Sequence, residues 1–174
     1  MNRRRLQLLL IVAAFALPAL IAVLLQTRWF HWDPSATRNR GELIVPVIAL
    51  AGDARAASVF ADGRRWSVLV RLPERCDAGC ERRIALIGNI REAQGKEMER
   101  VHLVAWPSPG ATVPAVFTAW QPPTALGDSL ALNEGAVILV DPAGNAMMRY
   151  RSDTDPTDVR KDLAHLLRWS TLGK

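Results

Sequence analysis

The chain is poor in cysteine and histidine. Two cysteines and three histidines occur among 174 residues. The low number of cysteines excludes a disulfide-dense scaffold. No stripe of basic and aromatic residues is present, so we predict no nucleic-acid partner. The net charge of +5 leaves about +2 (5 − 3) once Arg3, Arg4 and Arg5 are set aside. The chain also has no Ser-His-Asp order, phosphate loop or paired-carboxylate motif, and it therefore predicts none of those chemistries.

The longest apolar run lies at the N-terminus. Residues 6–25 are almost unbroken apolar sequence, and Gln7 is their only strongly polar member. Twenty helical residues span about 30 Å, the thickness of a bilayer's hydrocarbon core. A cleaved signal peptide is the alternative, but its apolar region is usually only about 7–15 residues long and ends in a small-residue cleavage site. We therefore predict a cytoplasmic tail and transmembrane anchor over residues 1–27.

The charge on the two flanks of this segment predicts its orientation. The arginines at positions 3–5 favour a cytoplasmic N-terminus. In a bacterium this places a single-pass protein in the inner membrane, with its C-terminal domain in the periplasm. We predict a juxtamembrane linker over residues 28–40, with His31 at the membrane interface, and one exported domain over residues 41–174, which is long enough for a real core.

The exported domain shows alternating strand and helix patterns. We predict strands over residues 41–48, 66–72, 101–106, 136–140 and 146–150. The first strand should lie at an edge, because Pro46 cannot donate to a central ladder. We predict helices over residues 77–94 and 126–132, and a last helix that begins after Asp155. The crossover over residues 107–134 should be mostly irregular up to Pro123. This order predicts a thioredoxin-like α/β fold, a mixed sheet with flanking helices.

The two cysteines lie between the first buried strand and the helix that follows it. A thiol at a helix N-terminus has a lowered pKa because it faces the positive end of the helix dipole. Arg75, Arg82 and Arg83 add positive charge nearby. We predict that Cys76 is the more exposed and more acidic thiol. Cys80 lies one turn further on, along the apolar stripe of the helix, and is the expected resolving thiol.

Three interpretations of this C-x-x-x-C pair stay open. Cysteines at i and i+4 on one helical face can chelate a soft metal or close a disulfide. Closing a disulfide would require the first helical turn to loosen, because bridge geometry is strict. The pair is therefore a functional dithiol, a structural bridge, or two incidental buried thiols.

Three stretches of the chain resemble the Sco/SenC family of membrane-anchored thioredoxin-like proteins. They are residues 41–46, residues 66–80, and residues 136–169 with their Asp-Pro-x-Gly turn. The resemblance is closer still to small single-span proteins associated with bacterial cytochrome oxidase operons. Sco/SenC proteins are copper chaperones and thiol reductants for the copper A site of cytochrome c oxidase. The resemblance implies the inner membrane, oxidase subunits and assembly factors as partners.

The chain departs from the Sco pattern at two positions. Glu81 follows the second cysteine where Sco proteins have proline, and residues 132–136 lack the histidine that completes the Sco copper site. Two thiolates would remain as a soft donor pair that suits Cu(I). His102 is expected to pack in a strand, and His165 is expected to face solvent on the last helix.

We therefore predict an accessory factor for cytochrome c oxidase assembly. In it, Cys76 and Cys80 either handle copper or act as a thiol–disulfide oxidoreductase on a client. The alternative is a non-catalytic thioredoxin-like interaction module in which the two cysteines form a structural pair. Whether the protein is an enzyme follows from that choice, and the sequence leaves it open.

Overall fold

The computed structural model describes residues 3–26 and 39–172, and it divides the chain into two units, Met1–Arg38 and Asn39–Lys174. Most of the predicted linker 28–40, including His31, lies outside the described residues. The first unit contains one helix, α1 (Arg3–Gln26). Across the described part of the chain, no helix has both the length and the apolarity needed to cross a membrane. The structure thus does not bear out the transmembrane part of the predicted fold.

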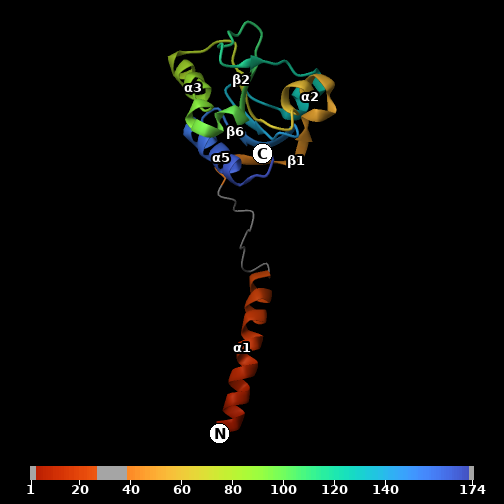
Figure 1. The fold of residues 1–174 in the computed structure, drawn as a ribbon, viewed down its shortest axis with the longest axis vertical. Helices are drawn as coiled ribbons and strands as arrows, with labels where there is room; N and C mark the ends of the chain where they lie inside the picture. The colour runs from red at the N-terminus through yellow and green to blue at the C-terminus, as the bar shows by residue number, and fades with distance from the viewer. Residues whose placement is uncertain (1–2, 27–38, 173–174) are drawn as a thin grey trace. The chain divides into compact units, whose positions relative to one another are not determined.

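The second unit is built on a mixed six-stranded sheet (Figure 1). Its strand order is β1-β6-β5-β2-β3-β4. Strands β2, β3 and β4 run parallel to one another, whereas β5, β6 and β1 are added by antiparallel pairing. The bounds are β1 Glu42–Ala49, β2 Trp66–Leu72, β3 Val101–Pro107, β4 Thr118–Ala119, β5 Val137–Val140 and β6 Asn145–Tyr150.

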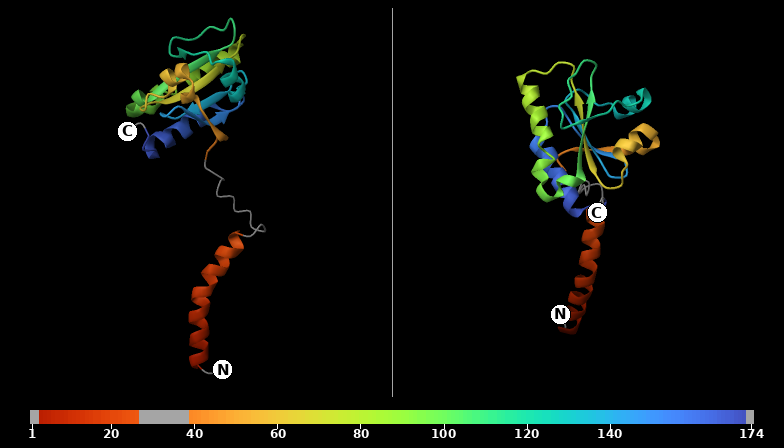
Figure 2. Two further views of the ribbon diagram at one scale, coloured as in Figure 1. Left: turned by 90° about the vertical axis from the view of Figure 1, so that its right-hand side faces the viewer. Right: turned by 45° about the horizontal axis from the view of Figure 1, so that its top comes forward.

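Helices cover both faces of this sheet (Figure 2, right). Helices α3 (Ala78–Gly88) and α5 (Pro156–Trp169) contribute to one apolar cluster, and α2 (Ala54–Phe60) and α4 (Thr124–Leu130) contribute to the other. The short 3₁₀ segments are η1 (Leu50–Gly52) and η2 (Glu92–Arg100). Alternate side chains of a strand point to opposite faces, and β2 accordingly supplies Val68 and Val70 to the first cluster and Leu69 to the second.

Most of the predicted elements are confirmed. All five predicted strands form, and β1, which contains Pro46, lies at a sheet edge. The last helix begins as predicted, because the Asp155 side chain accepts a hydrogen bond from the Thr157 N–H and Pro156 occupies the first turn. His165 on this helix is exposed, as expected.

Two helical expectations differ from the structure. The predicted helix 77–94 ends at Gly88, and the chain continues in the tighter turns of η2, in which Gly95 has a φ of 57°. The sequence analysis also missed α2, a seven-residue helix. Asp53 caps α2 by accepting from the backbone of Arg55 and Ala56. That helix is too short to show a recognisable helical period, so its cap was the only available signal.

A buried carboxylate fixes the chain where it enters the second unit. Asp162 of α5 is 4% exposed. It accepts hydrogen bonds from the backbone of Arg40 (2.8 Å) and Gly41 (3.1 Å) and from the Tyr150 hydroxyl (2.9 Å). A Cβ atom on Gly41 would lie 2.6 Å from the Tyr150 ring, so only glycine allows this close approach. Asp162 thereby connects α5 both to the segment that enters the unit and to β6.

Tyr150→Phe should destabilise the protein by about 1.5–3 kcal/mol, the usual range for a lost hydrogen bond to a charged group. Urea denaturation monitored by tryptophan fluorescence measures this change in the free energy of unfolding. A loss below about 0.5 kcal/mol would show that the Asp162 network does not depend on the hydroxyl.

Tyr150 should also make the free energy of unfolding depend on pH in the alkaline range. Burial and then the charge of Asp162 raise the pKa of Tyr150 above its ordinary value of about 10. The folded state therefore holds the proton more tightly, and this stabilisation is complete below pH of about 10 and is lost above it. Tyr150 is the only tyrosine, so tyrosinate absorbance should appear only as the protein unfolds. Ionisation of Tyr150 near its ordinary pKa of about 10 while the protein is still folded would contradict this prediction.

Candidate functional site

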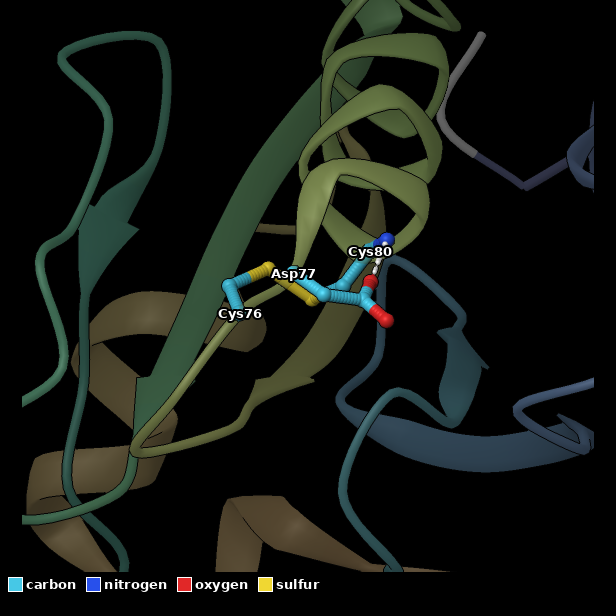
Figure 3. The surroundings of a disulfide bond; sticks show 3 residues. All are labelled: Cys76, Asp77 and Cys80. Carbon is cyan, nitrogen blue, oxygen red and sulfur yellow. Dashed lines mark hydrogen bonds between the residues drawn. A yellow bond between two sulfur atoms is a disulfide. The ribbon is translucent and has the colours of Figure 1, made fainter.

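The two cysteines lie at the N-terminus of α3 and form a disulfide bond (Figure 3). Their Cα atoms are 5.2 Å apart, within the range that a disulfide accepts. Cys76 precedes Asp77, the N-cap residue, and Cys80 lies in the first turn of the helix. The expectation that a bridge would loosen the first helical turn is therefore wrong, because one cysteine lies outside the helix.

Asp77 holds the first turn of α3 in place beside the bridge. Its Oδ1 accepts a hydrogen bond of 2.8 Å from the Cys80 N–H, as Figure 3 shows. A capping carboxylate satisfies a backbone donor that has no partner within the helix. The two cysteines are half-buried in this bridged form. The cap also places a carboxylate beside the bridge.

Arg83 ties the cysteine helix to distant parts of the chain. Its guanidinium donates to the carbonyl oxygens of Thr154 and Arg151, in the connection between β6 and α5, and to that of Gly135, just before β5. Burial lowers the pKa of Arg83, and the nearby Asp153 and Asp155 oppose that shift. The sequence analysis counted Arg83 only as a source of charge. Its contacts show that it also positions α3.

A cavity of about 710 Å³ opens beside the disulfide, and we call it the disulfide cavity. Cys76 and Cys80 line it together with two basic residues, Arg75 and Arg83, and two acidic residues, Asp77 and Glu134. The Glu134 carboxylate, in the loop before β5, accepts a hydrogen bond of 2.6 Å from the hydroxyl of Ser108. Ser108 is itself buried. The sequence analysis did not place Glu134 beside the cysteines, because the two come together only through the pairing of β2 with β5.

A second cavity of about 580 Å³ also includes Cys76 in its wall. It lies between α3 and the crossover that follows β3, and we call it the crossover groove. Its walls include Ile84 of α3 and Val116 and Phe117 of the crossover. Cys76 therefore lies where two cavities of different composition meet, and an incoming sulfur atom could be flanked by both.

The described residues do not form a copper site of the Sco kind. They contain no group of three or more histidine, cysteine, aspartate or glutamate side chains that could hold a metal ion. The loop before β5 contributes Glu134 to the cavity, and its oxygen atoms are poor ligands for Cu(I). The bridge engages both sulfur atoms, so two thiolates become available only after reduction. The donor set thus fits a two-thiolate site at most.

Among the described residues, neither His102 nor His165 lines a cavity beside the cysteines. His102 on β3 lies 2.9 Å from the Thr118 hydroxyl of β4, through its Nε2 atom. Burial, followed by the charge of Arg65, lowers the pKa of His102. It is among the lining residues of neither cavity, and its expected role as a packed strand residue agrees with these contacts.

Comparison with known proteins places this fold in a family. A family model described as "Transmembrane-like, thioredoxin-like, C-terminal domain" matches residues 66–170. The chain belongs to this family. The match covers β2, the cysteine helix and every element up to α5, and it confirms the predicted thioredoxin-like mixed α/β fold. No curated protein matches the chain.

Solved structures of Sco proteins are similar to the chain at low identity. One is a SCO1/SenC family lipoprotein from Bacillus anthracis, with 15% identity and a TM-score of 0.42 over 61% of this chain and 83% of that chain. Another is ScoI from Bradyrhizobium japonicum with copper bound, with 13% identity and a TM-score of 0.44 over 72% and 98%.

A third is BsSco, a member of the Sco family of cytochrome c oxidase assembly proteins, with 12% identity and a TM-score of 0.44 over 63% of this chain and 84% of that chain. The chain is thus distantly similar to Sco/SenC proteins, as its motifs predict. Likeness at this level assigns no activity.

Substitution of Asp77 should separate its capping role from its charge. Asp77→Ala should lower the free energy of unfolding by about 1 kcal/mol, because the Cys80 N–H loses its acceptor. Asp77→Asn keeps an acceptor and should cost much less. In the reduced protein, Asp77→Asn should also speed alkylation of Cys76 by iodoacetamide, because a negative charge beside the thiolate is removed. Equal destabilisation by both variants would contradict the capping role.

Proposed function

We propose that this protein is a thiol–disulfide exchange factor for cytochrome c oxidase assembly. The observation that carries the proposal is the Cys76–Cys80 bridge at the N-terminus of α3, beside an open cavity. A bridge that only stabilised the fold would need no such opening. The resemblance of residues 66–80 and 136–169 to Sco/SenC proteins supports an oxidase client.

The proposed reaction transfers two electrons from the dithiol form to a client disulfide. The Cys76 thiolate attacks one client sulfur, which forms a mixed disulfide and releases the other client sulfur as a thiolate. The Cys80 thiolate then attacks the Cys76 sulfur, which closes the bridge and releases the second client thiolate. The client ends reduced and this protein oxidised. An external dithiol must reduce the bridge again before the next cycle.

The surroundings of Cys76 favour its role as the attacking sulfur. A thiolate just before a helix is stabilised by the helix dipole, and the positive charges of Arg75 and Arg83 line the same cavity. The helix dipole and the two arginines favour negative charge on the Cys76 sulfur in the reduced protein, and the carboxylates of Asp77 and Glu134 in the same cavity oppose it. Cys80 has its backbone N–H engaged by Asp77 and lies within the helix, which suits a resolving thiol that acts only on its neighbour.

Copper would be a cargo in this scheme. The reduced pair offers two soft donors to Cu(I), and residues 132–136 contain no histidine, where the resemblance implies one. This donor set supports Cu(I) handling as a secondary role and does not support Sco-type Cu(II) binding.

The bacterial inner membrane is the proposed location, with the second unit in the periplasm. This part rests on the arginine-flanked apolar residues 6–25.

A second candidate is a non-catalytic interaction module with a structural bridge. The closed bridge and the presence of Glu81 where Sco proteins have proline favour it. The two candidates differ in how readily the bridge is reduced. Structural disulfides resist reduction by glutathione because their potentials lie below about −300 mV, whereas exchange-active bridges lie above that value.

Glutathione redox buffers and cysteine variants test the proposed function. The bridge should equilibrate with glutathione, and Cys80→Ser should accumulate a mixed disulfide on Cys76 that Cys76→Ser does not form. Mass spectrometry of alkylated protein measures both. Cu(I) titration of the reduced protein, with Cys76→Ser/Cys80→Ser as control, reports the secondary role.

A bridge that stays closed in reducing glutathione buffer, together with normal oxidase maturation in cells carrying Cys76→Ser/Cys80→Ser, would overturn the exchange function. That pair of results would leave the interaction module as the remaining candidate.

A further inference from the structure

The crossover groove differs from the disulfide cavity in its charged lining residues. One wall is α3, which contributes Ile84 and Ala85, and the other is the crossover, which contributes Pro114 and Val116. Phe117 is only 7% exposed and forms part of its floor, whereas Val116 is 59% exposed at its rim. An exposed valine above a buried aromatic ring is an apolar surface that a partner could cover.

The two walls of the groove approach each other closely at Gly88. A Cβ atom on Gly88 of α3 would lie 3.2 Å from a Val116 methyl group, so α3 and the crossover are in close contact there. Cys76 is also among the lining residues. A chain joined to the Cys76 sulfur would therefore have apolar surface available directly beside it.

The charge of the groove is negative on a positively charged protein. Glu74 and Glu81 are its only charged lining residues, and both are exposed. Neither forms an ion pair within the described residues 3–26 and 39–172. The disulfide cavity on the other side of Cys76 is lined instead by two arginines, Arg75 and Arg83, and by two carboxylates, Asp77 and Glu134. The groove is thus acidic, whereas the charges that line the disulfide cavity balance.

We propose that the crossover groove binds an extended polypeptide segment of the client. An apolar side chain next to the client cysteine would cover Val116 and Phe117, and a lysine or arginine beyond it would lie near Glu74 and Glu81. This inference rests on the proposed exchange function and names the class of client that the same site prefers. The volume of about 580 Å³ is within the usual range of ligand pockets, roughly 300–1,000 Å³.

Two matched peptides test the preference. Each carries one cysteine as a mixed disulfide with a chromogenic thiol, followed by leucine and then by either arginine or glutamate. The reduced full-length protein should react with the arginine peptide roughly tenfold faster at low ionic strength. Salt should reduce this ratio, because the Debye length falls to about 3 Å at 1 M. Equal rates for the two peptides would overturn the inference.

Charge variants identify the residues that are responsible for the preference for the arginine peptide. Glu74→Gln/Glu81→Gln should abolish the preference, and Glu74→Lys/Glu81→Lys should reverse it. Glu42→Gln/Glu92→Gln is the matched control, because it makes the same change in net charge outside the groove and should leave the ratio unchanged. If the control also made the two peptides react at equal rates, the preference would be a general charge effect, and the assignment to Glu74 and Glu81 would be overturned.

A steric variant tests the shape of the groove. Ala85→Trp should slow both peptides and leave the rate with 2-hydroxyethyl disulfide unchanged, because that reagent is too small to need the groove. If the peptides reacted equally fast with Ala85→Trp and with the parent protein, the proposed position of the client segment would be contradicted.

The small disulfide also separates the two proposals. If neither it nor the peptides are reduced, the exchange function itself fails. If all three are reduced without discrimination, only the groove inference fails. Sedimentation velocity gives a further outcome: a dimer that dissociates in Glu74→Gln/Glu81→Gln would show that the groove holds a second copy of this chain, which would also overturn the client assignment.

Discussion

The site depends on one set of hydrogen bonds, those of Arg83. This side chain leaves the cysteine helix and donates to carbonyl groups before β5 and after β6, and its partner Thr154 is 71 residues away in sequence. It therefore sets the position of α3 against the antiparallel half of the sheet. Since α3 lines both the disulfide cavity and the crossover groove, both take their shape from this attachment.

The topology of the sheet explains why two unlike cavities meet at Cys76. Strand β2 has a parallel neighbour, β3, on one side and an antiparallel neighbour, β5, on the other. The end of β2 therefore lies between the crossover that leaves β3 and the loop that enters β5. The first connection supplies Val116 and Phe117, and the second supplies Glu134. A sulfur atom at this point can be approached from an apolar, acidic side and from a side lined by both arginines and carboxylates.

Local signals in the sequence predicted much of this fold because they act over a few residues. The apolar run at β2, the Asp155 cap and Pro156 of α5, and the edge position of the proline-containing β1 are all confirmed. The prediction was wrong where local signals compete. Gly95 is a plausible helix stop, but α3 ends at Gly88, where the helix packs against Val116 and Phe117. The helix α2 was missed because seven residues carry too little periodicity.

The sequence by itself determined the class of fold and the position of the cysteine pair after a buried strand, because strand pattern, capping and spacing are properties of neighbouring residues. Only the tertiary structure decided what surrounds the pair. It placed Cys76 before the helix so that a bridge closes without unwinding it, and it brought Glu134 and the crossover to opposite sides of the sulfur. Those contacts join segments tens of residues apart, and their geometry follows from strand pairing and from side-chain packing, which no local pattern encodes.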